Sequence, residues 1–140
     1  MKILVSACLL GRNCKYNGGN NRNQKVLDFL QGHEVVAVCP EVAAGLGVPR
    51  IPVEIVEGVV RDRDGNSYDE ALRSAVEGIL QEIKGLNIDC AVLQSRSPTC
   101  GVNQIYDGTF TGTRVKGMGL LARTLREHGI PLMDAEDVPE

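Results

Sequence analysis

The sequence predicts an α/β protein: one Rossmann-like, three-layer domain over residues 1–140, with a mostly parallel sheet and helices on both faces. Two observations support this prediction. Short apolar runs typical of buried strands alternate along the chain with segments whose apolar residues recur at helical spacing. The chain also has 140 residues, the length of one domain, and 43% of them are hydrophobic, which is enough to build a core.

The expected elements follow one another in a regular order. Strands are expected at four apolar runs, over residues 2–7, 34–38, 88–94 and 130–133. Helices are expected between these runs, over residues 23–31, 68–84 and 117–128. Residues 53–61 alternate and predict a short hairpin strand, followed by a turn over residues 62–65. Residues 41–52 and 95–110 are expected to be loops. Ser67 and Glu70 have the spacing of a capping box at the start of the second helix.

Composition and charge exclude some classes of function. The net charge is −3, so the chain lacks the basic face that duplex nucleic acid requires. Its apolar runs are too short to span a membrane, and we expect a cytoplasmic protein. In that compartment five cysteines, an odd number, indicate reduced, reactive or metal-bound thiols rather than disulfides.

Three of the cysteines each follow a different predicted strand. Cys8, Cys39 and Cys100 stand in loops flanked by glycine or proline, beyond the carboxyl ends of these strands. Ligands of open α/β sheets bind at that edge, so we expect the three thiols to converge there. Cys90 lies inside a strand pattern and is interpreted as a small buried side chain. Cys14, in a polar loop, is either an auxiliary thiol or has no role.

The residue types limit which metal these thiols would bind. There is no Cys-x-x-Cys pair, which disfavours a zinc ribbon, and both histidines stand at predicted helix ends. Three thiolates leave a four-coordinate ion one ligand short, whereas a cubane iron–sulfur cluster would keep one iron open as a Lewis acid. A zinc hydrolase and a non-catalytic iron–sulfur or metal-binding module, such as a sensor or sulfur-trafficking protein, remain as alternatives.

A phosphatase loop is excluded by one residue. Small tyrosine phosphatases and arsenate reductases have a cysteine after the first strand, then five residues and an arginine. Here Cys14 stands where that arginine would follow Cys8. The guanidinium that binds phosphate with two hydrogen bonds is therefore missing.

Several motifs together resemble one known family. They are Ser6-Ala7-Cys8-Leu9-Leu10-Gly11, Cys39-Pro40-Glu41, Ser95-x-Ser97-Pro98-x-Cys100-Gly101 and Tyr106-Asp107-Gly108-Thr109-Phe110. In this order, and over essentially the whole chain, they resemble the thiouracil desulfidase (TudS) family. The resemblance implies a [4Fe–4S] cluster held by Cys8, Cys39 and Cys100, with the fourth iron free of protein ligands. It also implies removal of sulfur, without net redox change, from a thiolated nucleobase or nucleoside.

Two further residues are candidates for proton transfer. Glu41 follows Cys39 by two residues and either moves a proton to or from an attacking water or accepts amide hydrogen bonds from its loop. Ser97 precedes Cys100 by three residues and either relays that water or caps the turn at Pro98. The resemblance favours a catalytic serine in this motif.

Three cations are candidates for substrate binding: Lys15, Arg50 and Arg96. They would bind carbonyl oxygens of the substrate or an anion. The alternative for each is an ordinary solvated surface charge.

Overall fold

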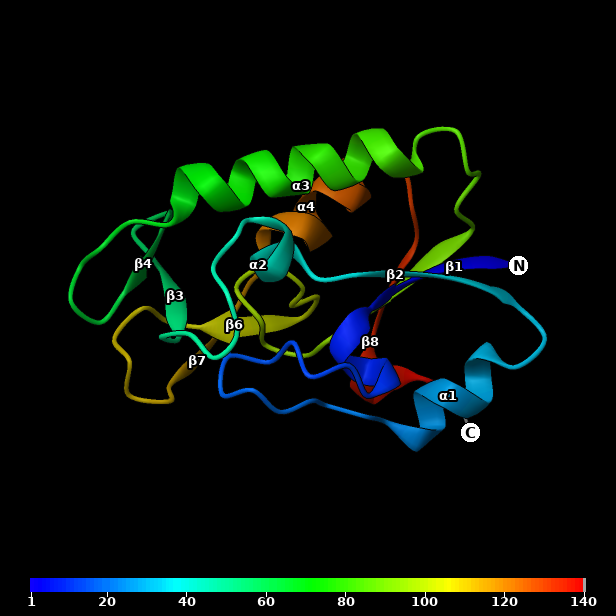
Figure 1. Ribbon diagram of the computed structural model, residues 1–140, viewed down its shortest axis with the longest axis horizontal. Helices are drawn as coiled ribbons and strands as arrows, with labels where there is room; N and C mark the ends of the chain where they lie inside the picture. The colour runs from blue at the N-terminus through cyan, green and yellow to red at the C-terminus, as the bar shows by residue number, and fades with distance from the viewer. Residues whose placement is uncertain (140) are drawn as a thin grey trace.

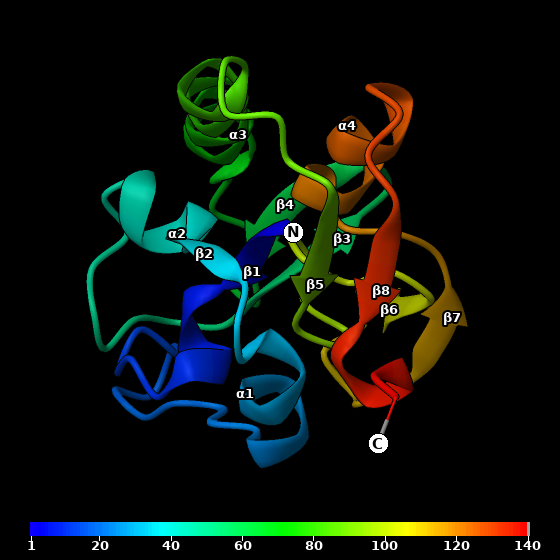
Figure 2. The ribbon, with the colours of Figure 1, turned by 90° about the vertical axis from the view of Figure 1, so that its right-hand side faces the viewer.

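The computed structural model describes residues 1–139 and is built on a four-stranded parallel sheet. The strand order is β2-β1-β5-β8, and all three neighbouring pairs are parallel. The bounds are β1 Lys2–Ser6, β2 Glu34–Val38, β5 Cys90–Leu93 and β8 Leu132–Asp134. Figure 2 shows α3 and α4 on one side of this sheet and α1 on the other. The prediction of an α/β fold with helices on both faces is confirmed.

The remaining elements surround the sheet (Figure 1). The α-helices are α1 Gln24–Leu30, α2 Pro40–Ala43, α3 Asp69–Ile83 and α4 Leu120–Glu127. The 3₁₀ helices are η1 Ala7–Leu10 and η2 Ala135–Asp137. Two antiparallel hairpins pair β3 Val53–Val56 with β4 Val59–Asp62, and β6 Gln104–Tyr106 with β7 Arg114–Lys116. Among the helices of residues 1–139, none is long and apolar enough to cross a membrane.

The core has two halves, one on each face of the sheet. In β1, Ile3 and Val5 belong to the half that includes Val26 of α1, while Leu4 between them belongs to the half that includes α3 and α4. This alternation follows from the two-residue period of a strand. Because β1 is covered on both faces, its three central side chains are all apolar and fully buried.

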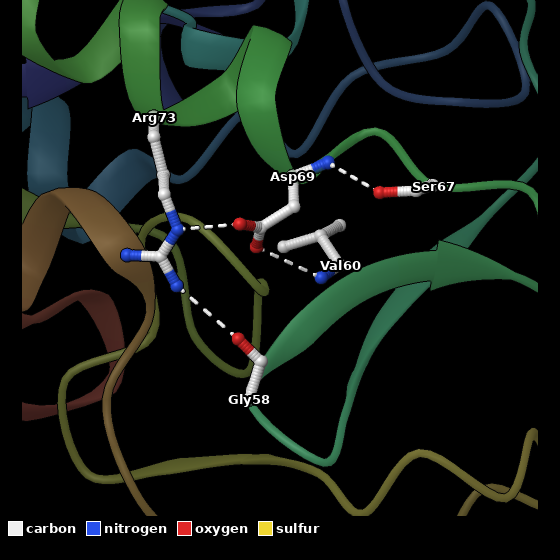
Figure 3. A network of polar contacts seen from close by, with 5 residues as sticks. All are labelled: Gly58, Val60, Ser67, Asp69 and Arg73. Atoms are coloured by element: carbon white, nitrogen blue, oxygen red, sulfur yellow. Dashed lines mark hydrogen bonds and ion pairs between the residues drawn. The ribbon is translucent and has the colours of Figure 1, made fainter.

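The start of α3 is tied to the β3–β4 hairpin by Asp69 (Figure 3). Asp69 Oδ1 accepts a hydrogen bond of 3.0 Å from the backbone N–H of Val60, and Oδ2 pairs with Arg73 Nε at 2.6 Å. Arg73 also donates to the carbonyl of Gly58 at 3.2 Å. The expected capping box does not form, because the helix begins at Asp69 after Tyr68 as its N-cap. The contacts of Asp69 and Arg73 with the hairpin hold the start of α3 instead.

Short elements appear where the sequence predicted loops. The first residues of the segment 41–52 belong to α2. This helix begins at Pro40, and Cys39 is its N-cap. Residues 95–110 contain β6, which is three residues long. Neither element is long enough to produce a periodic pattern, so neither could be recognised from apolar spacing. The single strand expected over 53–61 is interrupted by a turn at Glu57 and Gly58, and its two halves pair with each other as β3 and β4.

Candidate functional site

A cavity of about 510 Å³ lies beyond the carboxyl ends of β1, β2 and β5. It is lined by residues at the ends of all three strands, including Ser6, Val38 and Gln94. Every candidate site residue predicted from the sequence lines this cavity: Cys8, Lys15, Cys39, Glu41, Arg50, Arg96, Ser97 and Cys100. Residues far apart in the sequence thus meet at the edge of the sheet where α/β proteins bind ligands.

Each of the three cysteines is positioned by the strand before it. Cys8 follows β1 within η1, and Cys39 directly follows β2 as the N-cap of α2. Cys100 follows β5 after six intervening residues, and it is buried. Since β2, β1 and β5 are neighbours in the sheet, their carboxyl ends bring the thiols to the same cavity.

The protein environment keeps these thiols protonated in the absence of a metal. Burial raises the pKa of Cys39 to about 12, although the backbone N–H of Val42 opposes the rise. Burial likewise raises the pKa of Cys8 and of Cys100, and the nearby Glu41 carboxylate raises both further. A positively charged metal centre is what deprotonates thiols in such surroundings.

Hydrogen-bond donors surround the sulfur atoms. Asn21 donates from Nδ2 to Cys8 Sγ at 3.5 Å, and the N–H of Val42 reaches the sulfur of Cys39. The Ser6 hydroxyl forms a hydrogen bond with the sulfur of Cys100. Donors of this kind stabilise thiolate charge, and around metal sites they orient the ligands.

Glu41 and Ser97 are connected through Thr99. Thr99 Oγ1 lies 3.0 Å from Glu41 Oε1 and 3.0 Å from Ser97 Oγ. Ser97 Oγ also accepts hydrogen bonds from the backbone N–H of Thr99 and of Cys100, at 3.1 and 3.0 Å. Ser97 therefore does cap the turn at Pro98, and it also lines the cavity.

The three candidate cations differ in their surroundings. Lys15 lies with Nζ 5.8 Å from the centre of the Tyr16 ring, and Arg50 donates to the carbonyl of Gly47 at 3.0 Å. The guanidinium of Arg96 is paired with Glu136 at 2.7 Å. Arg96 thus has a partner of opposite charge on the side of η2, although it also lines the cavity.

Sequence reasoning missed several residues of the site. Asn21 stands among other asparagines of a polar loop, and nothing in its spacing distinguishes it. Thr99 is adjacent to Cys100, and a hydroxyl residue between proline and cysteine was the one available signal. Arg63 and Phe110 line the cavity from segments that were assigned to a turn and a loop.

The donor set fits an iron–sulfur cluster. Cys8, Cys39 and Cys100 line one cavity, together with Cys14 and without a histidine, and all four are free thiols. Across residues 1–139, no group of three or more His, Cys, Asp or Glu side chains is close enough to hold a single metal ion. Cluster ligands bind different iron atoms, so they do not have to converge on one point.

Comparison with known proteins identifies the family of this chain. A family model described as 2-thiouracil desulfurase matches residues 3–137. The chain belongs to this family. The resemblance inferred from the motifs is confirmed.

Two individual proteins of known sequence or structure resemble this member of the 2-thiouracil desulfurase family. One is the uncharacterized protein YbbK of Bacillus subtilis (strain 168), 31% identical over 146 residues and covering 97% of each chain. The other is a solved structure described as the [4Fe-4S]-dependent thiouracil desulfidase TudS. It is 36% identical, has a TM-score of 0.91, and the match covers 99% of this chain and 93% of that one.

Proposed function

We propose that this protein removes sulfur from a thiolated pyrimidine or a related thioamide, with a [4Fe–4S] cluster held by Cys8, Cys39 and Cys100. For thiouracil, the reaction takes the base and one water to uracil, hydrosulfide and a proton, with no net oxidation or reduction. The observation that carries the proposal is the cavity, where three cysteines from three strands meet Glu41 and Ser97. Membership of the 2-thiouracil desulfurase family and the likeness to TudS support it.

The cluster, when bound, would supply an iron atom without a protein ligand as a Lewis acid for the thiocarbonyl sulfur. The chain's own residues would handle the water and its proton. Ser97 lines the cavity and would orient the attacking water, and Glu41 would accept the proton that this water loses. Both groups line the cavity that Cys8, Cys39 and Cys100 also line, so water and substrate would meet beside them.

The cations would bind the polar edge of the substrate. Lys15 and Arg50 line the cavity, and we assign them to carbonyl oxygens or an anionic group of the substrate. Arg96 is proposed for the same role with less support, because Glu136 already holds its guanidinium. The aromatic rings of Tyr16 and Phe110 line the same cavity and suit a planar base.

The proposal is tested on protein prepared without oxygen. Iron, acid-labile sulfide and the release of sulfide from 2-thiouracil and 4-thiouracil are measured for the wild type and for variants. We expect Cys8→Ser to lose the cluster. Glu41→Ala and Ser97→Ala should keep the cluster and slow turnover by about 10²-fold or more, since general acid–base groups contribute roughly 10²–10⁴-fold.

Cys90→Ser is the matched control for the cysteine variants. Cys90 is half-buried in β5 and packs against the core on the α1 side of the sheet. Its substitution should leave both the cluster and the activity intact. A Cys100→Ser protein with an intact, active cluster would contradict the ligand assignment.

A second function is favoured by one observation, the position of Cys14. Cys14 lines the same cavity, and its backbone carbonyl lies 3.9 Å from Cys39 Sγ. If Cys14 supplies a fourth thiolate, the cluster has no open iron, and the protein is a non-catalytic iron–sulfur module. Cys14→Ser distinguishes the two functions, because a desulfidase keeps its cluster and turnover, whereas a closed four-cysteine site loses the cluster.

A further inference from the structure

Phe110 has a backbone conformation that is unusual for a large side chain. It lies in the loop of residues 107–113, which joins β6 to β7, and its φ is +59°. Gly108 and Gly112 of the same loop also have a positive φ, of +92° and +79°. Bulky residues rarely adopt this region, because Cβ then lies close to the carbonyl oxygen that follows. A phenylalanine at this place has a conformational cost that a third glycine would avoid.

The groups that hold this conformation come from outside the loop. Glu54 of β3 accepts with Oε1 from the backbone N–H of Gly108 at 3.0 Å and of Phe110 at 3.2 Å. Arg63, directly after β4, donates to the carbonyl of Phe110 at 3.4 Å. Both polar groups of the Phe110 backbone therefore have partners in the segment that contains the β3–β4 hairpin.

The loop approaches β3 closely. The strand before it, β6, lies beside β3 (Figure 1). A Cβ at Gly108 would lie 2.6 Å from the backbone carbonyl oxygen of Ile55, so a side chain there would push the loop away. This approach brings the N–H groups of the loop within reach of Glu54, and it fixes where the Phe110 ring can lie.

The ring of Phe110 is held at the wall of the cavity. Phe110 is half-buried and lines the cavity, as do Glu54 and Arg63. The guanidinium carbon of Arg63 lies 6.0 Å from the centre of the ring. Residues held in rare backbone conformations cluster at ligand sites, where the surrounding structure keeps them in place. An aromatic ring gains most from stacking on another flat ring, and less from a puckered, saturated one.

We propose that Phe110 stacks on the substrate and selects flat aromatic thiocarbonyl bases, and that Glu54 is the positioning residue that holds Phe110 in place. The inference rests on the proposed function and narrows its substrate class from thioamides in general to aromatic thiopyrimidines. Glu54 acts through the backbone N–H of Phe110, not by touching the substrate. Without this acceptor the loop relaxes, the ring leaves its place in most molecules, and the apparent affinity falls with the fraction that remains competent.

The stacking role is tested by equilibrium binding of two ligands that differ by one ring double bond. Uracil is flat, whereas dihydrouracil carries the same carbonyl and N–H groups on a puckered ring, and neither contains sulfur that could be removed. Calorimetry on cluster-loaded protein, prepared without oxygen, should show that the wild type prefers uracil by about 10-fold in Kd. Phe110→Leu should reduce this preference to less than about 2-fold, and Phe110→Tyr, which keeps a ring, should retain it. An unchanged preference in Phe110→Leu would overturn the stacking role.

The positioning role is tested by the KM for 2-thiouracil. Phe110→Leu should raise KM about 10-fold and Glu54→Leu about 5-fold with little change in kcat, since stacking contributes equally to the ground state and the transition state. Glu54→Gln keeps an oxygen that accepts from the two N–H groups and should restore most of the affinity. A Glu54→Leu protein with the wild-type KM would overturn the positioning role.

Thr111→Val is the matched control for a general disturbance of the loop. Thr111 is an exposed residue of the same loop, and its hydroxyl contacts those of Thr109 and Thr113 at 2.6 and 2.9 Å. Its substitution removes hydrogen bonds of the loop but leaves the contacts of Glu54 in place. KM should therefore stay at the wild-type value. A rise equal to that of Glu54→Leu would mean that any loosening of the loop has this effect, and would overturn the specific role of Glu54.

A double-mutant cycle distinguishes positioning from direct contact with the substrate. In the Phe110→Leu background, Glu54→Leu should raise KM by less than about 2-fold, because no ring is left to position. Multiplication of the two losses would mean that Glu54 touches the substrate, and would overturn the positioning role. If Glu54→Leu does not fold, Glu54→Asp replaces it with the same expectation, because its shorter side chain withdraws the oxygen from both N–H groups. Wild-type protein that prefers uracil but releases no sulfide would contradict the proposed function alone, whereas active protein without this preference would overturn the stacking role alone.

Discussion

Asn21 contacts a sulfur atom that the cluster would use. Its Nδ2 donates to Cys8 Sγ at 3.5 Å, and this hydrogen bond opposes the rise in the pKa of Cys8 that burial causes. In Asn21→Leu the thiolate of Cys8 loses that donor. We expect the cluster to form without oxygen but to pass its iron to a chelator about 10-fold faster, since partners of metal ligands typically change metal affinity 10- to 100-fold.

The matched control for Asn21 is an asparagine of the same loop. Asn13 is exposed, and its Oδ1 accepts from Asn20 rather than contacting a sulfur. Asn13→Leu should release iron at the wild-type rate. Equal release rates for the Asn21 and Asn13 variants would show that the hydrogen bond to Cys8 does not stabilise the cluster.

At the scale of residues, the sequence was most informative about the cysteines. Strand ends select Cys8, Cys39 and Cys100 from five cysteines, because parallel strands share one edge whatever the loops between them do. Thr99 and Asn21 could not be found in this way. Their roles depend on where a hydroxyl and an amide point after the chain folds, and no periodic pattern encodes that direction.

At the scale of elements, the Asp69 network joins α3 to the hairpin that forms one wall of the cavity. Val53 and Glu54 of β3 line the cavity, and β4 is held by the hydrogen bond from Val60 to Asp69. Partial burial by itself would raise the pKa of Asp69. The hydrogen bonds from Arg73 and Val60 together outweigh this effect, so the pKa of Asp69 is lowered. The charged form of Asp69 is therefore the one that the folded protein favours.

Asp69→Asn should destabilise the protein modestly. The amide keeps an acceptor for the Val60 N–H and loses the ion pair with Arg73 and the charge at the start of α3. Because the Arg73 side chain is about half exposed, we expect a decrease of only about 0.5–1 kcal/mol in the free energy of unfolding, measured in urea at pH 7.

Glu70→Gln is the control, since Glu70 is an exposed acid in the same first turn. It should lower the free energy of unfolding by only about 0.3 kcal/mol, from its interaction with the helix dipole. The loss for Asp69→Asn should shrink at pH 3. A folded-state pKa below the unfolded value means that the stabilisation by Asp69 is present above the unfolded pKa and disappears as the pH falls through the folded one. If the two variants lost the same free energy of unfolding, the contacts of Asp69 with the hairpin would not stabilise the protein.

Element boundaries show what spacing alone can predict. The long helix α3 and the buried strands were recognised because many residues repeat one pattern. The short helix α2 was missed, although Pro40 at its first position is a signal of a helix start. Its four residues bring Glu41 to the cavity, so the element that sequence reasoning missed is one that positions a candidate catalytic group.

At the scale of the whole molecule, the site depends on the sheet order. Cys8 and Cys39 follow the neighbouring strands β1 and β2, and Cys100 follows β5 on the other side of β1. The three thiols share a cavity only while these strands are paired. A cluster bound by all three therefore binds the folded chain in preference to the unfolded one, in which its ligands are far apart.

Removing the cluster should consequently destabilise the entire sheet. We expect protein that holds the cluster to unfold at a temperature at least about 3 °C higher than the same protein after anaerobic chelation, as 1 kcal/mol shifts Tm by about 2–5 °C at this size. The Cys8→Ser protein should show no such difference, while Cys90→Ser, whose cysteine lies on the α1 side of the sheet, should keep it. If the wild type unfolded at the same temperature with and without the cluster, the cluster would not be bound by residues that follow all three paired strands. The Cys8→Ser protein, which we expect to form no cluster, shows whether iron or the chelator by itself shifts the unfolding temperature.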